Sequence, residues 1–311
     1  MKVPFYKYSD YLKSIFGQKV YKLSIDGGFT CPNIDGTVAR GGCSYCNNRS
    51  FVPDYVSRRD AIEEQIDQGI RRQQKRSDSN HFLGYLQAFS NTYAPVEELE
   101  PLYRQILDHP RIIGLVIGTR PDCLPEPVIE LLTKLARVYY IGLEIGIESI
   151  YDDTLERVNR GHNFRAVIDA MESFRNTPVH LGTHIMLGFP GESYSQWMHE
   201  ADVVSELPIE YLKLHHLMVI RGTQMAREYR EDPFMIFSYD EWIKTAADFI
   251  ERLHPDIALA RLAAEAPDNL LIAPDWGTYN HGTIMQKVSE TLRKRNTRQG
   301  SRYRDSHQVT F

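Results

Sequence analysis

The chain has 311 residues, of which 42% are hydrophobic and 25% charged, and its formal net charge is −5. This composition is ordinary for a soluble globular protein, and a chain of this length buries enough surface to need no disulfide staples. No apolar run reaches the roughly 18 residues of a membrane helix, and residues 1–5 lack a signal-peptide pattern, so we expect no membrane association and a cytoplasmic location.

Short apolar runs alternate with helical patterns along the chain. The runs are mostly continuous and end at polar residues, Gly or Pro, which is typical of parallel strands buried on both faces. Between them apolar residues recur at helical spacing, with Ser57 and Asn163 as expected N-caps. The alternation predicts an α/β fold of about six (βα) units, in an open sheet or one curled toward a barrel. The expected strands are residues 19–24, 82–86, 112–117, 138–147, 179–189 and 211–220.

Three of the four cysteines lie in one loop directly after the first expected strand. Cys31, Cys43 and Cys46 have the spacing C-x₁₁-C-x₂-C. Clustered thiolates are soft ligands that suit iron–sulfur clusters or zinc. A structural zinc site normally has four ligands, whereas the next cysteine here is Cys123. Three thiolates on a four-iron cluster would leave one iron open, and the loop alone also allows a zinc site or free buried thiols.

Further unusual segments follow the other expected strands. Ligands bind at the carboxyl ends of the strands in parallel α/β folds, so we expect these segments to meet. Together with the cysteine loop, and in this order, they resemble the radical S-adenosylmethionine (SAM) superfamily, in the branch of the Elongator catalytic subunit and the small stand-alone YhcC/YtqA-type proteins. The resemblance spans about residues 17–230. The segments are Gly-Thr-Arg-Pro-Asp at 118–122, Leu-Glu-Ile-Gly-Ile-Glu-Ser at 143–149, Val-Asn-Arg-Gly-His at 158–162, Gly-Phe-Pro-Gly-Glu at 188–192 and Val-Ile-Arg-Gly-Thr at 219–223.

The resemblance implies a fold and a chemistry. The fold is a partial (βα)₆ TIM-like barrel of the radical SAM type, with a core over residues 17–253 and a short C-terminal extension with a basic tail over residues 254–311. A [4Fe–4S] cluster would bind Cys31, Cys43 and Cys46 and hold SAM on its open iron. An external electron donor of the flavodoxin or ferredoxin type would drive cleavage of SAM to a 5′-deoxyadenosyl radical. The implied substrate is a wobble uridine of tRNA. The alternatives are a radical SAM enzyme for a small molecule, and a non-catalytic iron–sulfur or zinc protein that binds RNA.

The resemblance also gives single residues a role in binding SAM. Tyr45 is implied to pack beside the adenine, and Glu148 takes the place of a ribose-contacting residue. Arg160 matches the arginine that pairs with the methionine carboxylate, a task that suits the guanidinium fork. His184 lies where the adenine and ribose pack. The remaining implied cofactor-binding residues are Arg120, Ser90, Asn91 and Thr92, the last three in a segment where Phe89-Ser90-Asn91 replaces the family's Gly-Gly-Glu.

Several of these polar residues also have a structural interpretation. Glu144 could be a buried partner of Arg120, and His184 a hydrogen-bonded core residue. We expect Cys123 to be an inert thiol. Lys213, His215 and His216, at the end of the last expected strand, could face the substrate, but we expect them to be ordinary barrel-lining residues.

The charge is distributed unevenly. Residues 283–311 carry seven Lys and Arg against Glu290 and Asp305, a net +5, so residues 1–282 sum to −10. A basic tail on an acidic body would fit a polyanion such as tRNA. The alternatives are a solvated, partly disordered terminus, or a tail that packs through Ile284, Val288 and Leu292.

Overall fold

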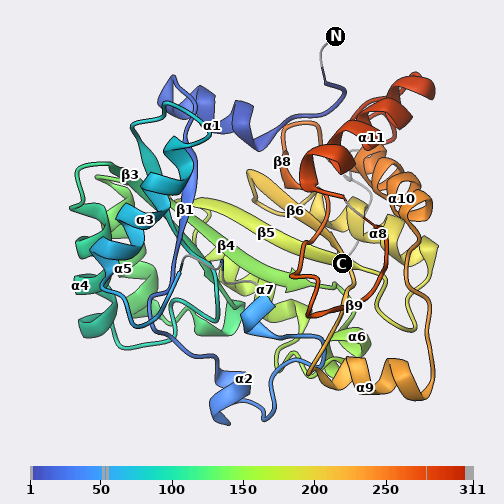
Figure 1. Cartoon of the computed structure of the whole chain (residues 1–311), viewed down its shortest axis with the longest axis horizontal. Helices are drawn as coiled ribbons and strands as arrows, with labels where there is room; N and C mark the ends of the chain where they lie inside the picture. The colour runs from blue at the N-terminus through green and yellow to red at the C-terminus, as the bar shows by residue number, and fades with distance from the viewer. Residues whose placement is uncertain (1–2, 51–52, 54–55, 278, 305–311) are drawn as a thin grey trace.

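The computed structural model describes residues 3–50, 53, 56–277 and 279–304. Figure 1 shows a curled parallel sheet flanked by helices. Seven parallel strands lie in the order β1-β2-β3-β4-β5-β6-β8, which confirms the expected α/β partial barrel. They are β1 (Tyr21–Ile25), β2 (Phe82–Leu86), β3 (Ile112–Thr119), β4 (Tyr140–Glu148), β5 (His180–Leu187), β6 (Tyr211–His216) and β8 (Ala258–Arg261).

The last expected strand was wrong in its extent. Residues 211–220 form two strands, because β6 ends at His216 and β7 (Val219–Ile220) turns away to pair antiparallel with β9 (Leu271–Ala273). The seventh strand of the sheet is β8 instead, which lies beside β6 with Arg261 opposite Lys213. A segment from the expected C-terminal extension therefore forms an edge of the barrel.

The helices follow their strands as expected, with one error at a helix start. Asn163 caps α7 by accepting a hydrogen bond from the Ala166 N–H, which confirms that N-cap. Ser57 does not cap a helix: residues 57–60 form a turn, and α3 begins five residues later at Ile62. The helices are α1 (Tyr8–Phe16), α2 (Pro32–Asp35), α3 (Ile62–Gln74), α4 (Val96–Leu107), α5 (Glu126–Ala136), α6 (Asp152–Arg157), α7 (Phe164–Glu172), α8 (Tyr194–Val204), α9 (Gln224–Glu231), α10 (Tyr239–Arg252) and α11 (His281–Lys294). None of the helices in the described ranges is long and apolar enough to span a bilayer.

A tyrosine floor, formed by Tyr8, Tyr11, Tyr140 and Tyr211, closes the amino-terminal end of the barrel. Tyr8 and Tyr11 come from α1, and the ring centroids of Tyr8 and Tyr211 are 4.6 Å apart. Gly182 makes room for this packing, because a Cβ there would lie 2.2 Å from the Tyr211 ring. With this end filled by aromatic rings, the carboxyl ends of the strands are left for ligands.

The basic tail packs against the core over its described part. Ile284, Val288 and Leu292 are fully buried where α11 packs on α10. Beyond α11, Arg295 and Arg302 form ion pairs with Glu251, at 3.1 and 2.9 Å. The packed tail is thus what the structure shows over residues 283–304, in place of a solvated, partly disordered terminus. Residues 305–311, with Asp305, lie outside the described residues.

Candidate functional site

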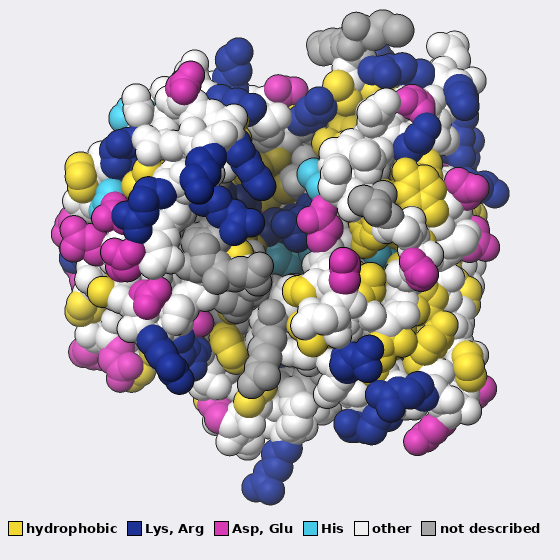
Figure 2. Space-filling view, viewed as in Figure 1, with side chains coloured by type: hydrophobic (Ala, Val, Ile, Leu, Met, Phe, Trp, Pro, Cys, Tyr) yellow, Lys and Arg dark blue, Asp and Glu magenta, His cyan; other side chains and the backbone are white. Residues whose placement is uncertain are grey.

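A cavity of about 540 Å³ opens at the carboxyl ends of the strands. Figure 2 shows it as the hollow near the middle of the face, with Lys, Arg and His side chains visible inside. Eight of the eleven expected site residues line it: Cys31, Cys43, Tyr45, Cys46, Arg120, Glu148, Arg160 and His184.

Two asparagines hold the cysteine loop in place. The Asn33 amide donates to the carbonyl oxygens of Asn159 and Arg160, at 2.6 and 2.9 Å. The Asn159 amide donates back to the Gly42 carbonyl oxygen at 2.8 Å. Because these bonds satisfy buried backbone groups on both loops, the cysteines are positioned by the protein itself. Neither asparagine was expected from the sequence.

All three cysteines of the loop are free thiols at the cavity. Burial raises the pKa of the Cys31 and Cys46 thiols. Since metal ligation needs thiolates, a positive metal centre is the natural partner of such a group. No group of three His, Cys, Asp or Glu side chains within the described ranges is arranged around a single metal ion. Three soft thiol donors that line one cavity fit an iron–sulfur cluster.

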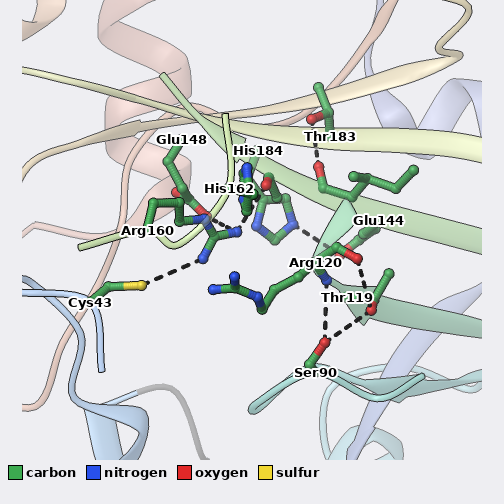
Figure 3. A network of polar contacts seen from close by, with 12 residues as sticks. Cys43, Ser90, Thr119, Arg120, Glu144, Glu148, Arg160, His162, Thr183 and His184 are labelled. Carbon is green, nitrogen blue, oxygen red and sulfur yellow. Dashed lines mark hydrogen bonds and ion pairs between the residues drawn. The ribbon is translucent and has the colours of Figure 1, made fainter. Parts of the chain in front are cut away.

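Two arginines carry unsatisfied donors beside the cysteines (Figure 3). Arg160 donates from Nη2 to the Gly146 carbonyl oxygen at 2.8 Å, and its Nη1 lies 3.8 Å from the Cys43 sulfur. Arg120 forms a bidentate pair with Asp122, at 2.7 and 2.9 Å. In the described part of the chain, Nε of Arg160 and Nη1 of Arg120 are buried without a hydrogen-bond partner. Buried donors are normally paired, so a bound acceptor such as a carboxylate would complete them.

The backbone at the end of β4 is strained where it enters the cavity. The register with β5 shifts between Gly146 and Glu148, and Glu148 has a φ of 70°. Positive φ is costly for a non-glycine residue and is found at functional sites. The bulge directs Glu148 toward Arg160, at 3.5 Å. Gly146 is needed for this approach, because a Cβ there would lie 2.8 Å from Arg160 Nη2.

The expected cofactor-binding segment Ser90-Asn91-Thr92 lies mostly behind the cavity wall. Ser90, Asn91 and Thr92 are fully buried, and none of them is among the lining residues. The Asn91 amide donates to the Ala88 and Gly118 carbonyl oxygens, at 3.0 and 2.9 Å. The segment contributes Gln87 and Phe89 to the lining instead.

Cys123 lies in the same packed layer. It is buried and outside the cavity lining, and burial raises the pKa of its thiol to about 12. Both features fit the inert thiol that we expected.

A second polar group lies between the cysteines and the tyrosine floor. The fully buried Glu144 accepts from Lys22 at 2.8 Å and from Lys213 at 2.5 Å. It also contacts the Tyr85 hydroxyl and His184 Nε2, at 2.7 and 3.2 Å. The alternative in which Glu144 pairs with Arg120 is not what the structure shows, because Asp122 takes that arginine. Burial opposes ionisation of Glu144, but the charges of Lys213 and Lys22 outweigh it and hold its pKa well below the ordinary value.

Comparison with known proteins identifies the family. The model of the radical SAM superfamily matches residues 35–204, and that of the Radical_SAM C-terminal domain matches residues 209–294. The chain belongs to the radical SAM superfamily. It is an enzyme of that class, and the expected membership is confirmed.

Two relatives and one solved structure show how far this radical SAM protein resembles others. It is 31% identical to YtqA of Bacillus subtilis, over 93% of this chain and 90% of that protein. It is 24% identical to the tRNA uridine(34) acetyltransferase of Methanocaldococcus infernus, over 52% of this chain and 30% of that protein. The structure of Elp3 from Methanocaldococcus infernus, with an N-terminal deletion, has a TM-score of 0.68 at 17% identity, covering 90% of this chain and 64% of that one. This last likeness shows the shared fold.

The radical SAM site also contains residues that the sequence analysis did not single out. Lys22 reaches Glu144 from β1, and Arg261 enters the cavity from the unexpected strand β8. The alternation of residues along a strand could have indicated Lys22, which points to the opposite face from its neighbours Tyr21 and Leu23. Arg261 gave no such signal, because β8 has only four residues.

Proposed function

We propose that this radical SAM protein holds a [4Fe–4S] cluster on Cys31, Cys43 and Cys46, binds SAM beside it, and modifies a uridine of tRNA. One observation carries the proposal: three free cysteines meet two arginines with unsatisfied buried donors in one cavity. When bound and reduced by an external donor, such a cluster supplies the electron that splits SAM into methionine and a 5′-deoxyadenosyl radical.

The chain's own residues would bind and orient SAM. Arg160 would receive the methionine carboxylate, because its Nε has no other acceptor in the described structure. Glu148, held by the bulge of β4, would accept from the ribose hydroxyl groups. Tyr45 lines the cavity and packs 5.4 Å from the buried Phe189 ring, centroid to centroid, so the supported Tyr45 ring would offer an apolar wall for the adenine. Burial lowers the pKa of His184, so its ring stays neutral and can exchange hydrogen bonds without adding charge.

Arginines at the rim of the cavity would contact the RNA backbone. Arg40, Arg58 and Arg221 are exposed and lie next to residues that line the opening: Arg40 and Arg221 are adjacent in sequence to Gly41 and Gly222, and Arg58 lies over the Phe89 ring. Figure 2 shows Lys and Arg side chains gathered on the surface beside the hollow. The rim suits this role because its arginines flank the opening, although Arg58 also pairs with Asp26 at 3.5 Å, whereas Arg295 and Arg302 of the tail neutralise Glu251. The relative named as a tRNA uridine(34) acetyltransferase supports the choice of a uridine.

A comparison of tRNA nucleosides tests the whole proposal. We expect tRNA from cells lacking the gene to have lost one modified uridine by mass spectrometry. The wild-type gene should restore it, and a gene encoding Cys43→Ala should not. Identical nucleoside profiles in all strains would contradict the tRNA substrate. In that case the formation of 5′-deoxyadenosine by the reduced, purified enzyme would leave a small molecule as the substrate.

A triple variant tests the rim separately. Arg40→Gln, Arg58→Gln and Arg221→Gln together should weaken tRNA binding about tenfold or more. The variant should also have a flatter plot of the logarithm of the tRNA binding constant against the logarithm of the salt concentration. We expect the slope to change by about two to three, since each lost phosphate contact removes about 0.7–0.9. Arg137→Gln is the matched control, because Arg137 is equally exposed but follows α5, before the amino-terminal end of β4. Equal tRNA affinity for both variants would remove the rim from the RNA contact.

A further inference from the structure

Among the described residues, one cation that lines the cavity has no acidic partner. Its lining includes the cations Arg120, Arg160, Lys213 and Arg261. Arg120 pairs with Asp122, and Arg160 lies 3.5 Å from Glu148. In the part of the chain that the structure describes, Arg261 forms no ion pair.

The acids near Arg261, Glu144 and Glu265, already accept hydrogen bonds from other groups. Glu144 accepts from both Lys22 and Lys213, so one carboxylate serves two lysines. Glu265, four residues after Arg261, accepts a hydrogen bond from the His281 N–H instead. Around Glu144 the chain therefore places three cations against one carboxylate. Burial lowers the pKa of Lys213, yet even with this lysine neutral one positive charge remains uncompensated.

The register of the sheet directs Arg261 into the cavity. Arg261 lies opposite Lys213 on the neighbouring strand, and residues paired in this way point to the same face of a sheet. Lys213 points inward to Glu144, so Arg261 points inward as well. His215, two residues after Lys213, shares this face. Its Nε2 is buried without a hydrogen-bond partner in the described structure.

We propose that Arg261, with His215 and Lys213, forms a subsite for an anionic group, a carboxylate or a phosphate, on the molecule that the enzyme modifies or consumes. A guanidinium fork binds such groups through two parallel hydrogen bonds. The excess charge is uncompensated inside a cavity, where desolvation makes an unpaired charge costly until a ligand matches it. The subsite lies on β6 and β8, across the barrel from Arg120, which directly follows β3, so SAM and the anionic group would occupy separate walls. This inference rests on the proposed function only in taking this cavity as the place where the substrate binds.

Chemical protection of Arg261 tests the subsite in the intact enzyme. The anaerobic holoenzyme is incubated with SAM but no reductant, so that the SAM carboxylate occupies Arg160. Phenylglyoxal then modifies accessible arginines in the presence of acetate, phosphate, uridine 5′-monophosphate or uridine, with sodium chloride at equal ionic strength. We expect an anion other than chloride to slow modification of Arg261 at least fivefold and to leave the control Arg137 unchanged. Protection by acetate alone would assign a small carboxylic acid, and protection by uridine 5′-monophosphate a nucleotide phosphate.

Variants give a second, independent measurement. Arg261→Gln should weaken binding of the protecting anion at least tenfold, measured by the shift in melting temperature, and Arg261→Lys should retain part of it. Protection no greater than that by chloride, or equal affinity in Arg261→Gln, would overturn the subsite. The 5′-deoxyadenosine assay separates the two proposals. An enzyme that cleaves SAM but binds no anion disproves the subsite alone, whereas one that binds anions but never cleaves SAM disproves the proposed function.

Discussion

Glu144 and Cys43 line the same cavity, but their surroundings differ in how far polar groups are paired within the protein. Around Glu144, Lys22, Lys213, Tyr85 and His184 already supply donors, so the carboxylate is ionised and satisfied within the fold. Around Cys43, two thiols have a raised pKa and two arginines keep unpaired nitrogens. At the deep end of the cavity the Glu144 carboxylate is thus satisfied by the protein itself, whereas the thiols and arginines of the cysteine end are completed by what binds there. Variants at the two ends should therefore fail in different ways.

The largest expected effect is at the cysteine end. Changing Cys31, Cys43 or Cys46 to Ala should remove nearly all iron from anaerobically purified protein. A four-iron cluster with one open iron needs a thiolate on each of its other three irons, so the loss of one cysteine leaves a second iron without a ligand. Iron content and the brown absorption of the cluster measure this. Cys123→Ala is the control and should keep both, since Cys123 lies outside the cavity lining. Stoichiometric zinc without iron in the wild-type protein would contradict the cluster.

The next effect is on stability and belongs to the deep end. Glu144→Gln should lower the free energy of unfolding by about 3–5 kcal/mol, because it leaves buried lysines without their carboxylate. Urea denaturation measures the loss. Glu100→Gln is the control: its partners Arg104 and Lys134 are exposed, so the change should cost under about 1 kcal/mol. Equal losses for the two variants would show that Glu144 does not stabilise the barrel.

The same carboxylate predicts a dependence on pH. The pKa of Glu144 in the folded protein lies below the ordinary value of 4.5, so its stabilising contribution is complete above that pH. It is lost as the pH falls from 4.5 toward the folded pKa, because protons then bind the unfolded chain more readily. Glu144→Gln should lack this part of the acid destabilisation. Wild-type and variant curves that stay parallel between pH 5 and pH 3 would contradict the low pKa.

A smaller effect is expected on SAM affinity. Arg160→Ala should weaken SAM binding by about tenfold or more while the iron content stays normal, because the methionine carboxylate loses a charged donor. Equilibrium binding to the unreduced holoenzyme measures it. Arg165→Ala provides the control on a fully exposed arginine of α7 that pairs with Asp169. Unchanged SAM affinity would remove Arg160 from the proposed site.

The smallest effect concerns a buried carboxylate without a cation. Glu200 on α8 is as buried as Glu144, but burial and the neighbouring Glu192 raise its pKa well above 4.5. Its neutral form is favoured by folding, so stability should fall as the pH rises above 4.5 and the unfolded chain releases this proton. Glu200→Gln should flatten that slope by up to about 1.4 kcal/mol per pH unit. An exposed control, Glu172→Gln, should leave the slope as it is. A wild-type slope that Glu200→Gln does not alter would show that Glu200 ionises normally.

The features that could be predicted from the sequence are those with a local signal. The apolar runs of the sequence located β1 to β6. The rule that strand ends converge in a parallel sheet placed Arg160 and Glu148 in the same cavity as the cysteines. Asn163 was recognised as a cap because its side chain acts within the next three residues. These interactions depend on neighbours in sequence or on the general rule for parallel sheets.

The remaining features depend on tertiary contacts that no local pattern records. The run over residues 211–220 contains no Gly or Pro that would divide it, so nothing in it shows that Val219 leaves the sheet to meet Ala273. Ser57 has the chemistry of a cap, but the turn at Asp60 delays the helix. The choice of Asp122 over Glu144 as the partner of Arg120 depends on which acid the lysines occupy.

The hydrogen bonds of Gln299 set an order of assembly during synthesis. Its backbone N–H donates to the Pro4 carbonyl oxygen, and its side chain accepts from the Tyr6 N–H. The cysteine loop, by contrast, meets residues that precede β8: the Met225 N–H donates to the Ser44 carbonyl oxygen, and Phe234 and Ile236 pack against the cluster that contains Cys43 and Tyr45. Chains fold from the N-terminus as they emerge from the ribosome. The cysteine loop can thus find these supporting contacts while β8 is still unmade, before the two ends of the polypeptide are joined.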